Sequence, residues 1–116
     1  MIRKITLAAV LLLGAAPALA SPPPQGPEVR IPRMSNFLEW VADGKNGVYI
    51  QAESGKWYYA RTQSRCPRLR PATSLSFQTS RGELDRFGAL RVEGWRCPLA
   101  SVVESGPPPA GKRNLR

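Results

Sequence analysis

The sequence contains no histidine, which excludes the side chain most often used for acid–base chemistry near neutral pH. Ser–His and Cys–His nucleophiles and histidine metal ligands are excluded with it. Acidic residues are also scarce, at 8 against 17 Lys and Arg. Because a calcium site gathers several carboxylates, this scarcity argues against one, and we expect no cofactor.

Long hydrophobic runs are scarce too, and the one present lies close to Met1. Residues 1–4 form a short basic head, residues 5–16 are apolar and uncharged, and residues 18–20 read Ala-Leu-Ala. This pattern predicts a secretory signal peptide that is cleaved between Ala20 and Ser21. The apolar run is shorter than the roughly 20 residues that a membrane-spanning helix needs, and position 21 offers no cysteine for lipidation. We therefore expect a periplasmic or secreted protein whose mature chain has no transmembrane segment.

Cysteine is limited to Cys66 and Cys97, which do not form a C-x-x-C redox or metal motif. In an exported protein, an even pair of this kind predicts a disulfide bond.

Proline-rich segments flank the part of the sequence that can form a core. After the signal peptide (1–20), we predict a linker over residues 21–34, one small domain over 35–105 and a disordered basic tail over 106–116. The alternative for the two flanks is a spacer and a polybasic foot for an anionic surface.

Two stretches of alternating residues, 48–53 and 56–62, flank Ser54-Gly55. A two-residue loop here predicts a β-hairpin in which residue 53 lies opposite 56 and residue 50 opposite 59. The predicted core face then consists of Val48, Ile50, Ala52, Trp57 and Tyr59. The predicted outer face consists of Tyr49, Gln51, Glu53, Lys56 and Tyr58.

A second hairpin is predicted where residues 87–92 and 95–100 flank Glu93-Gly94. Pairing Val92 with Trp95 turns Cys97 inward and gives a face that is apolar at every position. Further strands are expected at 74–80 and 37–41, although an Asn36–Glu39 capping box leaves a short helix open at the latter. The expected core residues are Trp57, Tyr59, Leu75, Phe77, Leu90, Val92, Trp95 and Leu99. The expected fold is mainly β, a small antiparallel barrel or curled sheet of roughly five to six short strands with one disulfide.

An ordered series of short motifs runs through residues 35–104. They are Phe37 and Trp40, Val48-Tyr49-Ile50, Trp57-Tyr58-Tyr59-Ala60, Cys66-Pro67-Arg68-Leu69, Ser76-Phe77, Gly82-Glu83-Leu84-Asp85-Arg86-Phe87, Leu90-Arg91-Val92 and Cys97-Pro98-Leu99. In this order and spacing they resemble a family of small exported proteobacterial proteins catalogued only as a domain of unknown function. The resemblance implies a signal peptide, a paired cysteine and no established activity, so it assigns no functional site.

Arginines are the remaining functional signal. Removing Arg3 and Lys4 from the 17 basic residues leaves a net charge of +7 against the 8 acids. The candidate anion-binding residues are Arg61, Arg65, Arg68, Arg70, Arg91 and Arg96. Arg91 and Arg96 are predicted to lie opposite each other, which is unfavourable for like charges unless an anion or Glu93 lies between them. Arginine also binds phosphate in a bidentate manner, although a solvated basic surface is the alternative interpretation.

We therefore expect a non-enzymatic envelope module whose basic surface contacts an anionic lipid, a polysaccharide or a partner protein. Nucleic acid is not an expected partner, because the exported compartment holds little of it and no recognised motif is present. The alternative is a small envelope enzyme that uses a carboxylate pair, either Glu39 with Asp43 or Glu83 with Asp85.

Overall fold

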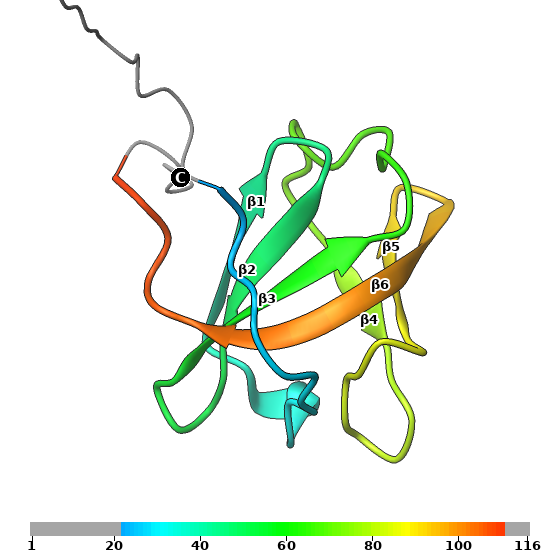
Figure 1. The fold of residues 1–116 in the computed structure, drawn as a ribbon. Helices are drawn as coiled ribbons and strands as arrows, with labels where there is room; N and C mark the ends of the chain where they lie inside the picture. Colours follow the sequence, from blue (N-terminus) through cyan, green and yellow to red (C-terminus); the bar gives the residue numbers. More distant parts are fainter. Residues whose placement is uncertain (1–21, 111–116) are drawn as a thin grey trace, which may run out of the picture.

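The computed structural model describes residues 22–110, which form six antiparallel strands and one short 3-10 helix. The predicted signal peptide, its cleavage point at Ala20–Ser21 and the end of the predicted tail lie outside the described residues. The elements are η1 (Met34–Asn36), β1 (Glu39–Asp43), β2 (Gly47–Gln51), β3 (Trp57–Thr62), β4 (Ser76–Gln78), β5 (Ala89–Val92) and β6 (Trp95–Ser105). They form one sheet in the order β1-β2-β3-β6-β5-β4, which curls into a half-barrel (Figure 1). The mainly β prediction is confirmed.

β6 is the long strand that joins the two halves of the sheet (Figure 1). Its second half pairs with β3 and its first half pairs with β5. Between them the register with β3 shifts, because Arg61 pairs with Ser101 whereas Thr62 pairs with Leu99. An extra residue of this kind bends a strand and increases its twist, and this bend carries the sheet around the core.

The main core fills the concave side of the curled sheet. Its largest fully buried side chains include Ile50, Leu69, Leu90, Leu99 and Val102. At the two edges of the sheet, Phe37 before β1 meets Phe77 of β4, with ring centroids 5.2 Å apart in an edge-on arrangement. Side-chain packing thus closes the side that backbone pairing leaves open.

The segment before η1 belongs to the folded unit, although the sequence suggested a linker up to residue 34. The Val29 amide donates to the Val102 carbonyl at 2.9 Å, and Ile31 forms a β-bridge with Leu84. Ile31 and Met34 are both buried in the main core. The folded unit therefore begins earlier than position 35, because a non-local partner, the free side of β6, pairs with this segment.

The register of the first hairpin differs from the prediction by one residue. Ile50 lies opposite Tyr58, not Tyr59, because the loop contains three residues instead of two. The Gly55 amide donates to the Ala52 carbonyl at 2.8 Å, and Gly55 has a left-handed φ of 92°. A turn followed by a left-handed glycine is the usual three-residue hairpin loop, and the extra residue exchanges the two faces of the following strand.

This shift places the aromatic residues of β3 on faces opposite to those expected. Tyr58 lies in the main core with Val48 and Ile50. Tyr59 instead packs on the outer face of the sheet, where it forms a small second cluster with Tyr49, Val41 and Val103, and Trp57 covers it in part. The prediction that Trp57 and Tyr59 belong to the main core is therefore wrong, although Tyr59 is fully buried.

The second hairpin has the predicted register. Val92 pairs with Trp95, Arg91 with Arg96, and Leu90 with Cys97. Leu90, Val92 and Leu99 are buried as expected, whereas Trp95 is 51% exposed because it follows the turn at the open end of the sheet. Leu75 and Phe77 are partly buried and pack against the core.

The Cys66–Cys97 disulfide is present, with Cα atoms 5.7 Å apart. Cys66 is fully buried and Cys97 nearly so. The bond ties the segment after β3 to the start of β6, at the end of the barrel that faces upward in Figure 1.

Candidate anion-binding site

Arg91 and Arg96 lie side by side on the outer face of β5 and β6, directly opposite each other in the antiparallel pairing. Gln78 of β4 holds both guanidinium groups. Its Oε1 atom accepts a hydrogen bond from Arg96 Nε at 2.8 Å and lies 3.5 Å from an Arg91 terminal nitrogen. Ser76 lies opposite Arg91 in the same row across the sheet.

Glu93 does not separate these two arginines, contrary to one expectation from the sequence. Its carboxylate pairs with Arg68 at 3.5 Å, and both side chains are largely exposed. A neutral amide oxygen therefore occupies the place where a counter-charge was expected, and it leaves the positive charge of the pair unneutralised. Sequence reasoning missed Gln78, because its role depends on how β4 lies beside β5.

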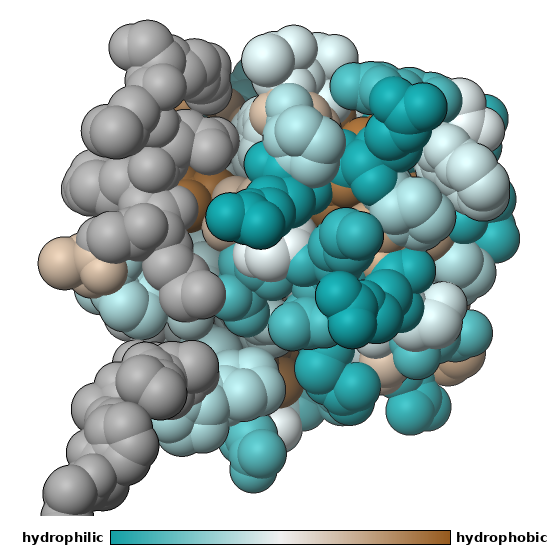
Figure 2. All heavy atoms as spheres, turned by 90° about the horizontal axis from the view of Figure 1, so that it is seen from above, coloured by the Kyte–Doolittle hydropathy of each residue, from teal (hydrophilic) through white to brown (hydrophobic). Residues whose placement is uncertain are grey.

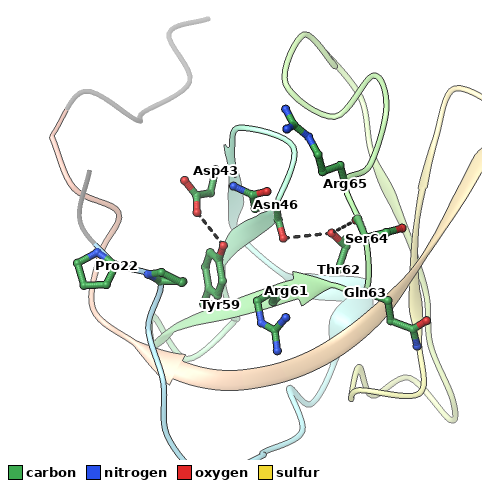
Figure 3. A pocket seen from close by; sticks show the side chains of 10 residues that line it. Pro22, Asp43, Asn46, Tyr59, Arg61, Thr62, Gln63, Ser64 and Arg65 are labelled. Atoms are coloured by element: carbon green, nitrogen blue, oxygen red, sulfur yellow. Dashed lines mark hydrogen bonds between the residues drawn. The ribbon is translucent and has the colours of Figure 1, made fainter. Parts of the chain in front are cut away.

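Arg61 and Arg65 line a different part of the surface, a groove of about 610 Å³ on the side of β3 (Figure 3). Pro22 and Pro23 lie along the same groove. The Thr62 hydroxyl, within hydrogen-bond distance of the Asn46 carbonyl at 3.1 Å and the Ser64 carbonyl at 2.7 Å, fixes the floor. The six candidate arginines thus do not form one cluster. Arg68 and Arg70 lie on the exposed segment that follows Cys66.

Figure 2 shows the molecule from above, where hydrophilic residues cover most of the visible described surface. In Figure 1 the upper end carries the β1–β2 turn, the segment after β3 and the tip of the β5–β6 hairpin. The disulfide brings the last two together and Arg68 pairs with Glu93 of the hairpin tip, so Arg68 lies near the end that carries the arginine pair.

Tyr59 and Asp43 form a partly buried polar contact in the groove. The Tyr59 hydroxyl donates to Asp43 Oδ2 at 2.7 Å (Figure 3). Burial, and then the hydrogen bond and the charge of Asp43, raise the pKa of Tyr59 far above its ordinary value. Burial and the same carboxylate also raise the pKa of Tyr49, whose ring lies 4.9 Å from that of Tyr59 between centroids.

These shifts predict an alkaline loss of stability. Below pH 10 the tyrosines are protonated in both the folded and the unfolded chain, so they add no pH dependence. Above pH 10 the unfolded chain releases protons that folded Tyr59 retains, and the free energy of unfolding falls by about 1.4 kcal/mol per pH unit for that residue. Urea unfolding between pH 9 and pH 11 should therefore show a smaller fall for Tyr59→Phe than for wild type. Equal pH dependence in the two proteins would contradict the assigned Tyr59–Asp43 contact.

The carboxylate pairs considered for catalysis have other surroundings. Glu39 and Asp43 begin and end β1, so about 13 Å of extended strand separates them. Glu83 and Asp85 both face the guanidinium of Arg30, at 3.7 and 3.8 Å. Glycosidase carboxyl groups lie roughly 5–9.5 Å apart across a substrate, which is shorter than the separation along β1. Glu83 and Asp85 are instead engaged by a shared arginine.

Within residues 22–110, no three His, Cys, Asp or Glu side chains come together as a metal site would require. No helix in the same range is long and apolar enough to cross a membrane.

No family model matches the chain, and no match was found among curated proteins or solved structures.

Proposed function

We propose that this protein is an exported, non-enzymatic binding domain whose Arg91–Arg96 pair binds anionic groups of the cell envelope. One observation carries the proposal: two guanidinium groups on neighbouring strands share a single neutral acceptor, Gln78 Oε1. Like charges directly opposite each other destabilise a strand pair. A ligand with two or more anionic oxygens would offset the repulsion between the two guanidinium groups.

The proposed binding mode uses the donors that the sheet already orients. A phosphate, sulfate or carboxylate oxygen would take the place of Gln78 Oε1 and accept hydrogen bonds from both arginines. The Gln78 amide would then turn its NH₂ group toward the ligand, because an amide carries both donors and an acceptor. Among the candidate arginines, Arg91 and Arg96 are favoured because both guanidinium groups converge on one atom.

The compartment expected for an exported protein indicates the class of partner. The predicted signal peptide and the disulfide are typical of an oxidising compartment outside the cytoplasm. The anions met there are phosphorylated lipopolysaccharide, phospholipid headgroups and acidic polysaccharides. The enzyme alternative has less support, because the two carboxylate pairs are separated along β1 or engaged with Arg30.

The test is binding to lipopolysaccharide and to phosphatidylglycerol vesicles at low and high salt. Replacing both arginines, as Arg91→Gln with Arg96→Gln, should weaken binding about tenfold or more, since each bond to a charged group contributes roughly 1.5–3 kcal/mol. Binding by wild type should fall steeply with added salt, because exposed charges are screened beyond about 10 Å at 0.1 M.

A charge-matched control separates this site from general basicity. Arg33→Gln with Lys56→Gln removes the same number of positive charges from exposed ion pairs with Glu53 and Glu104. Both positions lie at the other end of the sheet, near the turn between β2 and β3. Equal weakening by the two double variants would reduce the site to non-specific attraction and would refute the proposal.

A further inference from the structure

The segment before η1 wraps around β6, from the outer face of the sheet to its concave face. Residues 22–26 line two neighbouring hollows on the outer face, with volumes of about 610 and 440 Å³. The Val29 amide then bonds the Val102 carbonyl at the free side of β6, and Ile31 is buried in the main core. Figure 1 shows this segment, in blue, as it crosses β6.

The register of β3 and β6 fixes which side chains lie on the same face as residues 22–26. Tyr59 lies opposite Val103, and both belong to the outer apolar cluster. Arg61 lies opposite Ser101 in the next row of the same face. The larger hollow is lined by Tyr59 and the smaller one by Val103, whereas Arg61 lines both. The segment therefore runs along an aromatic and apolar surface that has an arginine beside it.

The outer apolar cluster is buried, although one face of an antiparallel sheet is commonly solvated. Tyr59 is fully buried, and Tyr49 and Val103 are nearly so. Within residues 22–110 there is one sheet and one short helix, and the buried residue of that helix, Met34, belongs to the main core. Segments without regular structure therefore cover the outer cluster, and residues 22–26 are one of them.

Packing, and not backbone pairing, holds this segment on the sheet. No backbone hydrogen bond joins residues 22–27 to another residue in the described part of the chain. The segment begins with three consecutive prolines, which fix φ and favour the extended polyproline II helix. Recognition domains bind such helices in aromatic-lined grooves, because a preformed helix loses little conformational entropy. The arrangement is that of a proline-rich ligand on its site, with the ligand supplied by the same chain.

We infer that this outer face is a binding site for extended, proline-rich segments. Residues 22–27 of the same chain occupy the site, and a proline-rich segment of a partner protein takes their place by competition. A tethered occupant acts at an effective concentration in the mM range, so it weakens the binding of a free partner without abolishing it. The inference does not depend on Arg91 and Arg96, which lie in the half of the sheet formed by β5 and β4.

The test measures the binding of two synthetic peptides to the full chain. One peptide has the sequence of residues 22–28, and the other has glycine in place of each proline. In the protein, replacing Pro22, Pro23 and Pro24 together by glycine should loosen the tethered segment, because glycine lacks the fixed φ of proline. The proline peptide should bind this glycine variant about fivefold or more tightly than it binds wild type. The glycine peptide should bind neither protein.

A longer side chain at Ser101 tests the position of the site. Ser101→Gln, introduced into the glycine variant, extends a side chain into the smaller hollow and should remove the binding of the proline peptide. The matched control is Ser80→Gln, at an exposed position after β4, which should leave the affinity of the glycine variant unchanged. Thermal unfolding of each variant shows whether it is folded.

Three results would contradict the inference. The first is binding of the proline peptide that is absent, or equal in wild type and the glycine variant. The second is equal binding of the two peptides, or equal binding by the Ser101→Gln and Ser80→Gln proteins. The third is a dimer of wild type that the glycine variant does not form, which would assign the surface to residues 22–27 of a second copy instead of a separate partner.

Discussion

Replacing Cys66 and Cys97 together by alanine should lower the free energy of unfolding by about 3–4 kcal/mol, according to the chain-entropy model of loop closure. The two residues are 31 positions apart and both are buried, so the bond restricts a large part of a small unfolded chain. For a domain of this size, the melting temperature should fall by roughly 15–30 °C. Thermal unfolding followed by circular dichroism checks this value.

Reduction provides the matched control for this prediction. Dithiothreitol should lower the melting temperature of wild type toward that of the double variant and should leave the double variant unchanged. A double variant that melts within about 3 °C of oxidised wild type would contradict the stabilising role of the bond.

Gly47→Ala should destabilise the protein by about 3 kcal/mol, at the upper end of the range for overpacking. An added Cβ at this position would lie 2.5 Å from the Ala60 carbonyl oxygen and 2.8 Å from the Tyr59 hydroxyl. The first of these atoms is backbone of the neighbouring strand and cannot move without disturbing the pairing. Gly47 also lies opposite Asp43, so the absence of a side chain leaves the space through which Tyr59 reaches that carboxylate.

The control for steric effects is Gly106→Ala, because an added Cβ there meets no atom within 4 Å. That variant should match wild type or be slightly more stable, since alanine has less backbone freedom in the unfolded chain. The measurement is urea unfolding of the three proteins. A Gly47→Ala variant as stable as wild type would show that the contact between β2 and β3 is looser than described.

The register of the second hairpin was predicted correctly because only a two-residue loop fits its turn. Glu93 and Gly94 both have left-handed φ values, of 48° and 86°, as a two-residue hairpin loop requires. The sequence of the first hairpin fits two registers, one with a two-residue loop and one with a three-residue loop. Tyr58 and Tyr59 are both aromatic, so a slip of one residue leaves an apolar face in either register. A left-handed Gly55 suits both loops, and the difference lies at Ser54, which does not take the positive φ that Glu93 takes in the two-residue loop.

Contacts between residues that lie far apart along the chain could not be predicted from the sequence. Ile31 lies in a proline-rich stretch and is buried only because Leu84 and β6 surround it. The opposition of Arg91 and Arg96 was predictable from one hairpin. Their convergence on Gln78 was not, because β4 pairs with β5 across a long loop that has no regular pattern.

The central claim is that Arg91 and Arg96 together bind an anion. The most direct measurement follows the arginine Nε–Hε resonances by NMR while inorganic phosphate is added at low salt. The account predicts that the Arg91 and Arg96 signals shift together and saturate at one dissociation constant, while the Arg33 signal, from an exposed ion pair, stays in place. Arginine signals that all drift alike without saturation would contradict it.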